Sequence, residues 1–345
     1  MTPPSLDILD ERLRRILTFV VESHVSSGEP VGSQYVRAAY HLSISPATIR
    51  NAMQQLEELG LLSHPHTSAG RVPTEQGYRY YVDHLMRPES LTPATRRALD
   101  EAIDDASLAG ALDERLPPAL AHAARQLAVV SVRPRDSSRV HRFELVGLEG
   151  GELLVAVGIE GGPLGTTTWH PAAPVEPTAV RGAEAWVRAS LPVPGAAGLD
   201  ALAIRARTEA RPEHTAILEA ALHLAARLVT GMEQPAVRLG GTEHIAAQPE
   251  FQTPDTLRPL VTVLAEREHL ARALESFAAA YLPQVSIGHE HMPAAIQSCS
   301  IVGMAVAIGP SRAVIGLMGP VRMPYRRVFA LLSYVGVRLA PGRDS

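Results

Sequence analysis

The sequence predicts an α+β protein of several domains, with an N-terminal winged helix-turn-helix and a later α+β domain that an insertion interrupts. Three observations predict this. Residues 10–74 fit three short helices followed by a β-hairpin, and strand-like runs lie on both sides of a helical block, at 127–159 and 300–318. The chain also has 345 residues, of which 46% are hydrophobic. That length exceeds what one hydrophobic core usually serves, so we expect two or three domains.

The first two helices are predicted from their starts and their apolar spacing. Asp10 can cap a helix that ends near Gly28 and whose apolar side chains recur at one-turn intervals, namely Leu13, Ile16, Leu17, Val20 and Val21. A second helix is expected to start at Gly32-Ser33 and to turn Val36, Ala39 and Tyr40 inward.

The third helix is predicted over SPATIRNAMQQLEELG, residues 45–60. Ser45 is its expected cap, Pro46 stands where a missing N–H costs nothing, and Gly60 ends it. Its buried face would be Ile49, Ala52, Met53, Leu56 and Leu59. The opposite face lacks charge at its start and carries Ala47, Asn51 and Gln54, with Arg50 on the flank and Glu57 and Glu58 only at the far end. This gradient suits a helix that enters a major groove by its N-terminus.

The side chains on that face can read bases. Arginine pairs with guanine, and asparagine or glutamine with adenine, through two hydrogen bonds each. We therefore predict base reading by Arg50, Asn51 and Gln54, with Ala47 and Thr48 close by. The hairpin would consist of a strand entry at 61–62, a polar loop at 63–69 and a return strand at 70–72, with Thr74 capping a fourth helix. Contacts to the DNA backbone are expected from the helix starts and this hairpin, at Ser33, Ser45, His66, Thr67, Ser68 and Arg71.

Two observations argue against DNA binding. A polar helix face is in most proteins simply solvated, and the net charge of this region is not basic. Residues 1–85 contain seven Arg against nine Asp or Glu, a balance of −2, and residues 32–74 contain three Arg against two Glu, or +1. A DNA-binding domain usually presents a basic patch. Affinity would therefore rest on geometry, on helix N-termini and on dimerisation more than on net charge.

Four stretches of this N-terminal region resemble one protein family. LDERLRRIL, SGEPVGSQYV, LSISPATIRNAMQQLEELGLL and HPHTSAGRVPTEQGYRYYVD closely resemble the N-terminal part of the heat-inducible transcription repressors of the HrcA family. The resemblance resumes at residues 239–251 and 302–328, which include GPVRMPY, and is weaker between them. SAGRVPT and GPVRMPY in one chain are highly specific, because other winged helices lack the pair.

The resemblance implies a domain order and a function. It implies a winged-helix domain at 1–86, a GAF-like domain in two parts at 87–171 and 256–345, and an inserted dimerising domain at 172–255. It also implies a homodimer that binds an inverted-repeat operator before heat-shock chaperone genes, that needs no cofactor, and whose activity the chaperonin maintains. Heat would draw the chaperonin to other clients and release transcription. The chief alternative is a winged-helix regulator gated by a small molecule in the GAF-like domain.

The rest of the chain favours helices at 95–128, interrupted at Gly110 and Pro117-Pro118, at 212–232, at 257–279 and at 325–339. Residues 171–198, rich in Ala, Pro and Gly, are interpreted as a boundary. In GPVRMPY we expect Arg322 and Tyr325 to tie the last strand to the closing helix rather than to bind a ligand.

Catalysis and metal binding find little support. His289 and His291 would share a face of a strand, but no third ligand lies nearby in sequence, and Cys299 is predicted to be a small core residue. Phosphate-cradling and nucleophile motifs are missing, so we expect no enzyme. The single cysteine and an N-terminus interrupted by charges favour a cytoplasmic protein without a membrane segment.

Overall fold

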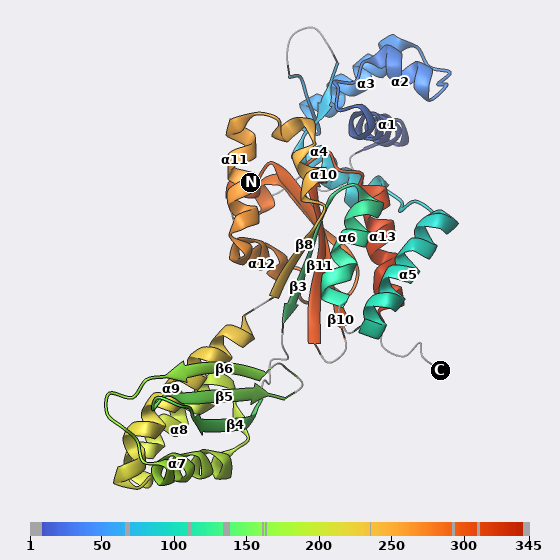
Figure 1. Ribbon diagram of the computed structural model, residues 1–345. Coiled ribbons are helices and arrows are strands. Elements are labelled where there is room, and N and C mark those ends of the chain that lie inside the picture. Colours follow the sequence, from blue (N-terminus) through green and yellow to red (C-terminus); the bar gives the residue numbers. More distant parts are fainter. Residues whose placement is uncertain are drawn as a thin grey trace. The chain divides into compact units, whose positions relative to one another are not determined.

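The computed structural model describes residues 9–65, 70–109, 112–133, 139–160, 162, 164–234, 236–291, 294–308 and 311–340. The chain forms two compact units (Figure 1). Unit 1 comprises Met1–Ser131, Val237–Val306 and Ala313–Ser345, and unit 2 comprises Val132–Ala236 and Ala307–Arg312.

Helix α1 (Glu11–Ser27) begins and ends as predicted. The Asp10 carboxylate accepts a hydrogen bond from the Leu13 N–H at 2.7 Å, which satisfies one of the free amides of the first turn. Gly28 ends the helix at φ 74°, a left-handed conformation that glycine adopts without strain. The predicted apolar stripe of α1 is buried.

Helices α2 (Ser33–Ala39) and α3 (Pro46–Glu58) follow, and Ser45 caps α3 by accepting from the Thr48 N–H at 3.1 Å. Ile49, Ala52, Met53 and Leu56 are buried, which confirms most of the predicted core face. Two predictions were wrong: Ala39 is exposed, and so is Leu59, at 39%. Ala39 is the last residue of the short helix α2, and Leu59 follows the end of α3, so neither is covered by a further helical turn.

Strands β1 (Leu62–Ser63) and β2 (Val72–Pro73) pair antiparallel, with Leu62 opposite Pro73. Each strand lies slightly later in the chain than predicted. Thr74 caps α4 (Glu75–Tyr80), which continues into a π-helical turn, η1 (Tyr81–Leu85).

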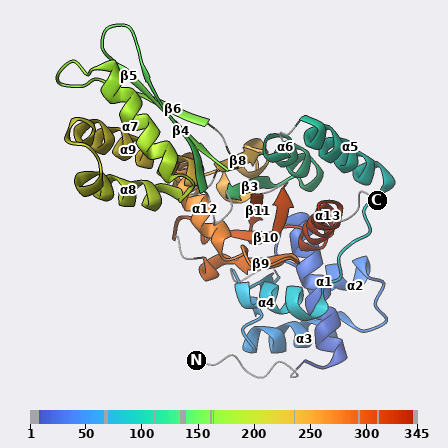
Figure 2. The same ribbon diagram turned by 90° about the horizontal axis from the view of Figure 1, so that it is seen from below.

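The larger part of unit 1 is a five-stranded sheet between two layers of helices. The strand order is β8 (Ala236–Gly240), β3 (Leu127–Arg133), β11 (Ser311–Pro320), β10 (Cys299–Ile308) and β9 (Gln284–Ile287). One face carries α10 (Thr242–Ala246), α11 (Pro254–Ala265) and α12 (Arg267–Glu275), and the other carries α5 (Pro93–Ala109), α6 (Leu112–Ala124) and α13 (Tyr325–Arg338) (Figures 1 and 2). Short 3-10 turns complete this unit, η2 (Pro249–Phe251), η3 (Gly288–Glu290) and η4 (Ala294–Ile296).

The predicted interruption at Pro117-Pro118 is wrong, because both prolines lie inside α6. Proline in a helix interior removes a hydrogen bond and costs about 3 kcal/mol. Burial of Leu116 and Leu120 on either side of the pair, and of Leu112, Ala121 and Ala124 on the same helix, offsets that cost.

Unit 2 is a four-stranded sheet with three helices on one face. The strand order is β6 (Leu164–Trp169), β5 (Leu153–Ile159), β4 (Arg139–Gly147) and β7 (Val193–Pro194), and the helices are α7 (Pro177–Ser190), α8 (Gly195–Glu209) and α9 (Pro212–Glu233). The boundary expected at 171–198 was wrong, since α7, β7 and the start of α8 occupy it. Although rich in Ala and Pro, α7 buries Val180, Ala183 and Val187 along one stripe.

The core of unit 2 explains why it begins before residue 172. Val140, Phe143 and Val155 from β4 and β5 pack in one cluster with Ala183 of α7 and Leu222 of α9. The strands at 139–159 therefore bury their apolar face against the inserted helices. Among the described helices, α9 alone is long and apolar enough to cross a bilayer, yet its apolar stripe belongs to this same core.

Candidate nucleic-acid interface

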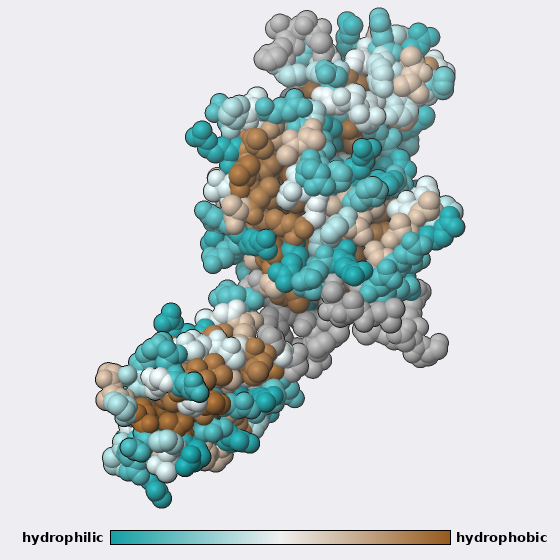
Figure 3. Space-filling model, viewed as in Figure 1, coloured by the Kyte–Doolittle hydropathy of each residue, from teal (hydrophilic) through white to brown (hydrophobic). Residues whose placement is uncertain are grey.

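The face of α3 predicted to read bases is exposed. Ala47, Arg50, Asn51 and Gln54 are exposed, and Thr48 is half-buried. The first turn of α3 contains no acidic residue, so the partial positive charge of the helix N-terminus is not cancelled there. The surface around α2 and α3 is mostly hydrophilic (Figure 3). Within the described part of the chain, Arg50 has no ion pair or hydrogen bond through its side chain, so its guanidinium is available to a partner.

A groove of about 550 Å³ lies beside this face. It is lined by the start of α2, by α3 and by the hairpin, and it brings together three of the predicted DNA-contacting residues, Ser33, Arg50 and Arg71. Ala47, Asn51 and Gln54 are not among its lining residues. Gln34 also lines the groove and was missed, and so does His64, which the sequence places in the polar hairpin loop, where it is expected to bond phosphate or water. Nothing in the pattern marks Gln34, because only the tertiary approach of α2 makes it a neighbour of Arg50.

The residues predicted to contact the DNA backbone differ in how accessible their side chains are. Ser45 is exposed, and its hydroxyl lies 2.9 Å from that of Thr48. Ser33 is only 8% exposed, which leaves little of its side chain for a phosphate. His66, Thr67 and Ser68 lie outside the described residues.

Arg71 is already paired within the protein. Its Nε lies 2.7 Å from a carboxylate oxygen of Glu57, at the last turn of α3. The Nε atom is shielded from solvent and makes no well-aligned hydrogen bond, so the contact is an ion pair rather than a directed bond. The other glutamate of that turn, Glu58, accepts a hydrogen bond from the Gln54 amide at 3.2 Å.

Residues 114–329 match the family model described as the HrcA protein C-terminal domain. The chain is 35% identical over 349 residues to the heat-inducible transcription repressor HrcA of Acidothermus cellulolyticus, covering 96% of this chain and 99% of that protein. It is 33% identical to the HrcA repressor of Thermobifida fusca, covering 97% and 98% of the two chains. This chain belongs to the HrcA family.

A solved structure described as that of a hypothetical protein matches the whole fold, with a TM-score of 0.58 and 19% identity over 96% of this chain and 97% of the other. This match supports the arrangement of elements. The HrcA relatives are similar over nearly their whole length, so the N-terminal helices and hairpin belong to the family together with the C-terminal domain.

Within the GPVRMPY motif, Tyr325 is fully buried and its hydroxyl lies 2.7 Å from the Ser300 hydroxyl of β10. It also donates to the Val321 carbonyl. Tyr325 thus ties the last strands to α13, as predicted. Arg322 instead contacts the end of α1 and Glu250, so it joins the N-terminal helices to the sheet domain.

The two histidines considered for a metal have other partners. Their segment is a 3-10 turn rather than the predicted strand, so the two side chains do not share a face. His289 bonds Glu75 at 2.9 Å, whereas buried His291 bonds the Ser286 hydroxyl and the Cys299 carbonyl, each at 3.0 Å. Across the described residues, no group of three or more His, Cys, Asp or Glu side chains is placed to hold a metal ion.

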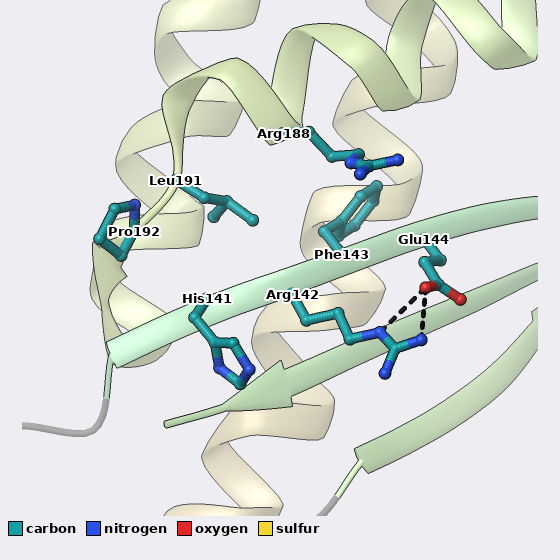
Figure 4. Close-up of a pocket in the computed structure, with 7 residues that line it drawn as sticks. All are labelled: His141, Arg142, Phe143, Glu144, Arg188, Leu191 and Pro192. Carbon is teal, nitrogen blue, oxygen red and sulfur yellow. Dashed lines mark hydrogen bonds and ion pairs between the residues drawn. The ribbon is translucent and has the colours of Figure 1, made fainter. Parts of the chain in front are cut away.

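A second hollow, of about 500 Å³, lies in unit 2 between β4 and the end of α7 (Figure 4). Arg142 and Arg188 line it, but both have acidic partners. Arg142 donates to Glu144 at 2.7 and 2.9 Å, and Arg188 lies 3.7 Å from Glu184. An anion in this hollow would therefore meet two arginines whose charge is already balanced by glutamates. The groove beside α3 differs, because Arg50 pairs with no described acidic side chain.

Proposed function

We propose that the protein is a transcription repressor of heat-shock chaperone operons that binds an inverted-repeat operator through a winged helix-turn-helix, α1 to α3 with β1 and β2. The observation that carries the proposal is the exposed, acid-free start of α3, with an Arg50 side chain that pairs with no described residue and lies beside a groove of about 550 Å³. Membership of a family whose curated members are named heat-inducible transcription repressors supports the biological role.

In this proposal α3 enters the major groove by its N-terminus. Arg50 pairs with a guanine, and Asn51 and Gln54 pair with adenines. Ala47 and Thr48 lie near the same bases. The amides at the starts of α2 and α3, with the Ser45 hydroxyl, face phosphates, and His66, Thr67 and Ser68 of the hairpin loop are expected to contact the DNA backbone.

Homodimerisation would compensate for the weak charge of the DNA-binding region, which is +1 over residues 32–74 (three Arg minus two Glu). Two copies add their contacts, and a two-fold axis matches an inverted repeat. We assign the dimer contact to unit 2, the insertion, and interpret the sheet domain of unit 1 as GAF-like. The protein would act in the cytoplasm, with the chaperonin as a further partner.

The heat response would come from loss of the folded repressor. A cost of one or two kcal/mol changes the active fraction of a marginally stable protein several-fold, and a chaperonin that refolds it restores the active state. Heat that diverts the chaperonin would then lower the amount of active repressor.

A footprint of the purified protein on the promoter of its own chaperone genes tests the DNA-binding role. We expect protection of two symmetric half-sites and a dimer by analytical ultracentrifugation. A strictly monomeric protein, or equal affinity for the protected sequence and a scrambled duplex, would contradict the proposal.

The chaperonin step needs a separate test. Operator affinity is measured before heating, after heating and cooling alone, and after cooling with chaperonin and ATP. We expect recovery only with chaperonin. Full recovery without it would remove the chaperonin from the mechanism and leave DNA binding untouched.

A further inference from the structure

The last turn of α3 carries an ion pair, Glu57–Arg71, that the proposed contact of α3 with DNA does not explain. The side chains of Glu57 and Arg71 are 32% and 22% exposed, and they approach to 2.7 Å. A carboxylate on a helix that meets DNA repels phosphate, and this repulsion weakens binding to any duplex. Glu57 therefore lowers general affinity for DNA unless its carboxylate provides something else.

The backbone of the return strand is held from its other side as well. The Arg71 N–H donates to the Val31 carbonyl at 2.9 Å, and the Val31 N–H donates to the Arg71 carbonyl at 2.8 Å. Gly70 allows this approach: its φ is +80°, and a Cβ there would lie 2.7 Å from the Val31 carbonyl. The start of the return strand is thus fixed between the entry to α2 and the end of α3.

We propose that Glu57 is a positioning residue for DNA recognition, which acts by holding Arg71 and so sets where the β1–β2 hairpin lies relative to α3. This inference rests on the proposed DNA-binding function. It also changes the role expected for Arg71, whose guanidinium serves the hairpin more than a phosphate. Both ends of the pair belong to elements that line the groove, so a shift of the hairpin alters the groove itself.

The test uses two substitutions that remove the same charge. E57Q breaks the ion pair, whereas E29Q removes an exposed carboxylate of the same region whose side chain has no partner among the described residues. Affinity is measured on a labelled duplex carrying the footprinted inverted repeat and on a scrambled duplex. If Glu57 only repels phosphate, E57Q and E29Q both tighten binding to both duplexes and leave their ratio unchanged.

We expect a different result. E57Q should lower the ratio of operator to scrambled affinity by roughly fivefold, while E29Q leaves it unchanged. R71Q should lower the ratio similarly, and the double variant should be no worse than either single one. If Arg71 bound phosphate directly, R71Q would reduce the salt slope by about one and weaken both duplexes alike, which would overturn the proposal.

A DNA-free measurement separates this inference from the proposed function. Hydrogen exchange at the Val31 and Arg71 amides reports the contact between hairpin and α2, and E57Q should speed it by roughly tenfold while E29Q does not. Unchanged exchange in E57Q would overturn the positioning role. If the wild type did not prefer the operator, the proposed function would fail, and the exchange rates would still decide what Glu57 does.

Discussion

Arg322 joins Glu250 to the end of α1. Its Nη2 donates to one Glu250 carboxylate oxygen at 3.2 Å, its Nε donates to the other, and its Nη1 donates to the Val25 carbonyl at 3.3 Å. The Arg322 side chain is only 15% exposed, so water screens the pair weakly. The N-terminal helices are thereby attached to the sheet domain through a defined polar contact.

Replacing Arg322 with alanine should destabilise this attachment. The change leaves Glu250 and the Val25 carbonyl without their donor, and we expect a loss of about 2–4 kcal/mol in the free energy of unfolding. Urea unfolding followed by circular dichroism measures it. Arg205→Ala is the control, because the Arg205–Glu209 pair is exposed; its loss, together with the contact of Arg205 over the Trp186 ring at 5.9 Å, should cost far less unfolding free energy than the loss of Arg322. Equal losses of unfolding free energy in the two variants would show that the Arg322 contact stabilises the fold no more than an exposed ion pair does.

Arg50→Ala should relax base preference at one operator position. Arg50 is exposed and pairs with no described residue, so the proposed bidentate contact with a guanine would be lost without damage to the fold, at a cost of roughly 1–3 kcal/mol. Competition between operators substituted at each position measures the effect. A loss of the same size on random duplex would identify Arg50 as a phosphate contact only.

Stability should fall as the solution becomes acidic. Burial, followed by the nearby positive charge of Arg322, lowers the pKa of His24 below the ordinary value for histidine, and burial also lowers the pKa of His291. The unfolded chain therefore binds protons at a higher pH than the folded one. As the pH falls below about 6.5, each histidine favours unfolding until the pH passes its folded pKa.

Unfolding free energies at about pH 7.5 and about pH 5.5 check this expectation, with His24→Gln and His291→Gln expected to flatten the slope between them. For His291 burial outweighs the hydrogen bond that its Nε2–H donates to the Cys299 carbonyl, which by itself would raise the pKa. If both variants lost as much unfolding free energy between the two pH values as the wild type, other groups would cause the acid sensitivity.

Cys299 should resist thiol reagents in the folded protein. It is fully buried at the start of β10, and burial raises the pKa of its thiol to about 12, so almost no thiolate exists near neutral pH. Ellman's reagent should label it only after unfolding, in parallel with the urea transition. Rapid stoichiometric labelling of the native protein would contradict this environment.

Much of unit 1 could be predicted because its signals are local. Asp10, Ser45 and Thr74 cap helices wherever those helices pack, and the spacing of Ile49, Met53 and Leu56 marks the buried face of α3 without knowledge of its neighbours. The exposed positions Arg50, Asn51 and Gln54 followed from the same spacing. Leu59 was misplaced because the helix ends before it.

Unit 2 was predicted less well because its composition is uninformative. Residues 171–198 were interpreted as a boundary because they are rich in alanine, proline and glycine, although α7 within them carries an apolar stripe. Their helices are stabilised by packing on β4 and β5 rather than by strong local preference. The start of unit 2 is therefore set by tertiary packing: the strands at 139–159 bury their apolar face against the helices of unit 2.

The sequence by itself determined the helices of the N-terminal region, most of their buried and exposed faces and the family, because caps, spacing and motifs are properties of neighbouring residues. Only the tertiary structure decided that Glu57 meets Arg71, that Gln34 and His64 join Arg50 at one groove, and that Arg322 contacts the end of α1. These contacts join segments distant in the chain, and their partners are selected by packing, which no local pattern encodes.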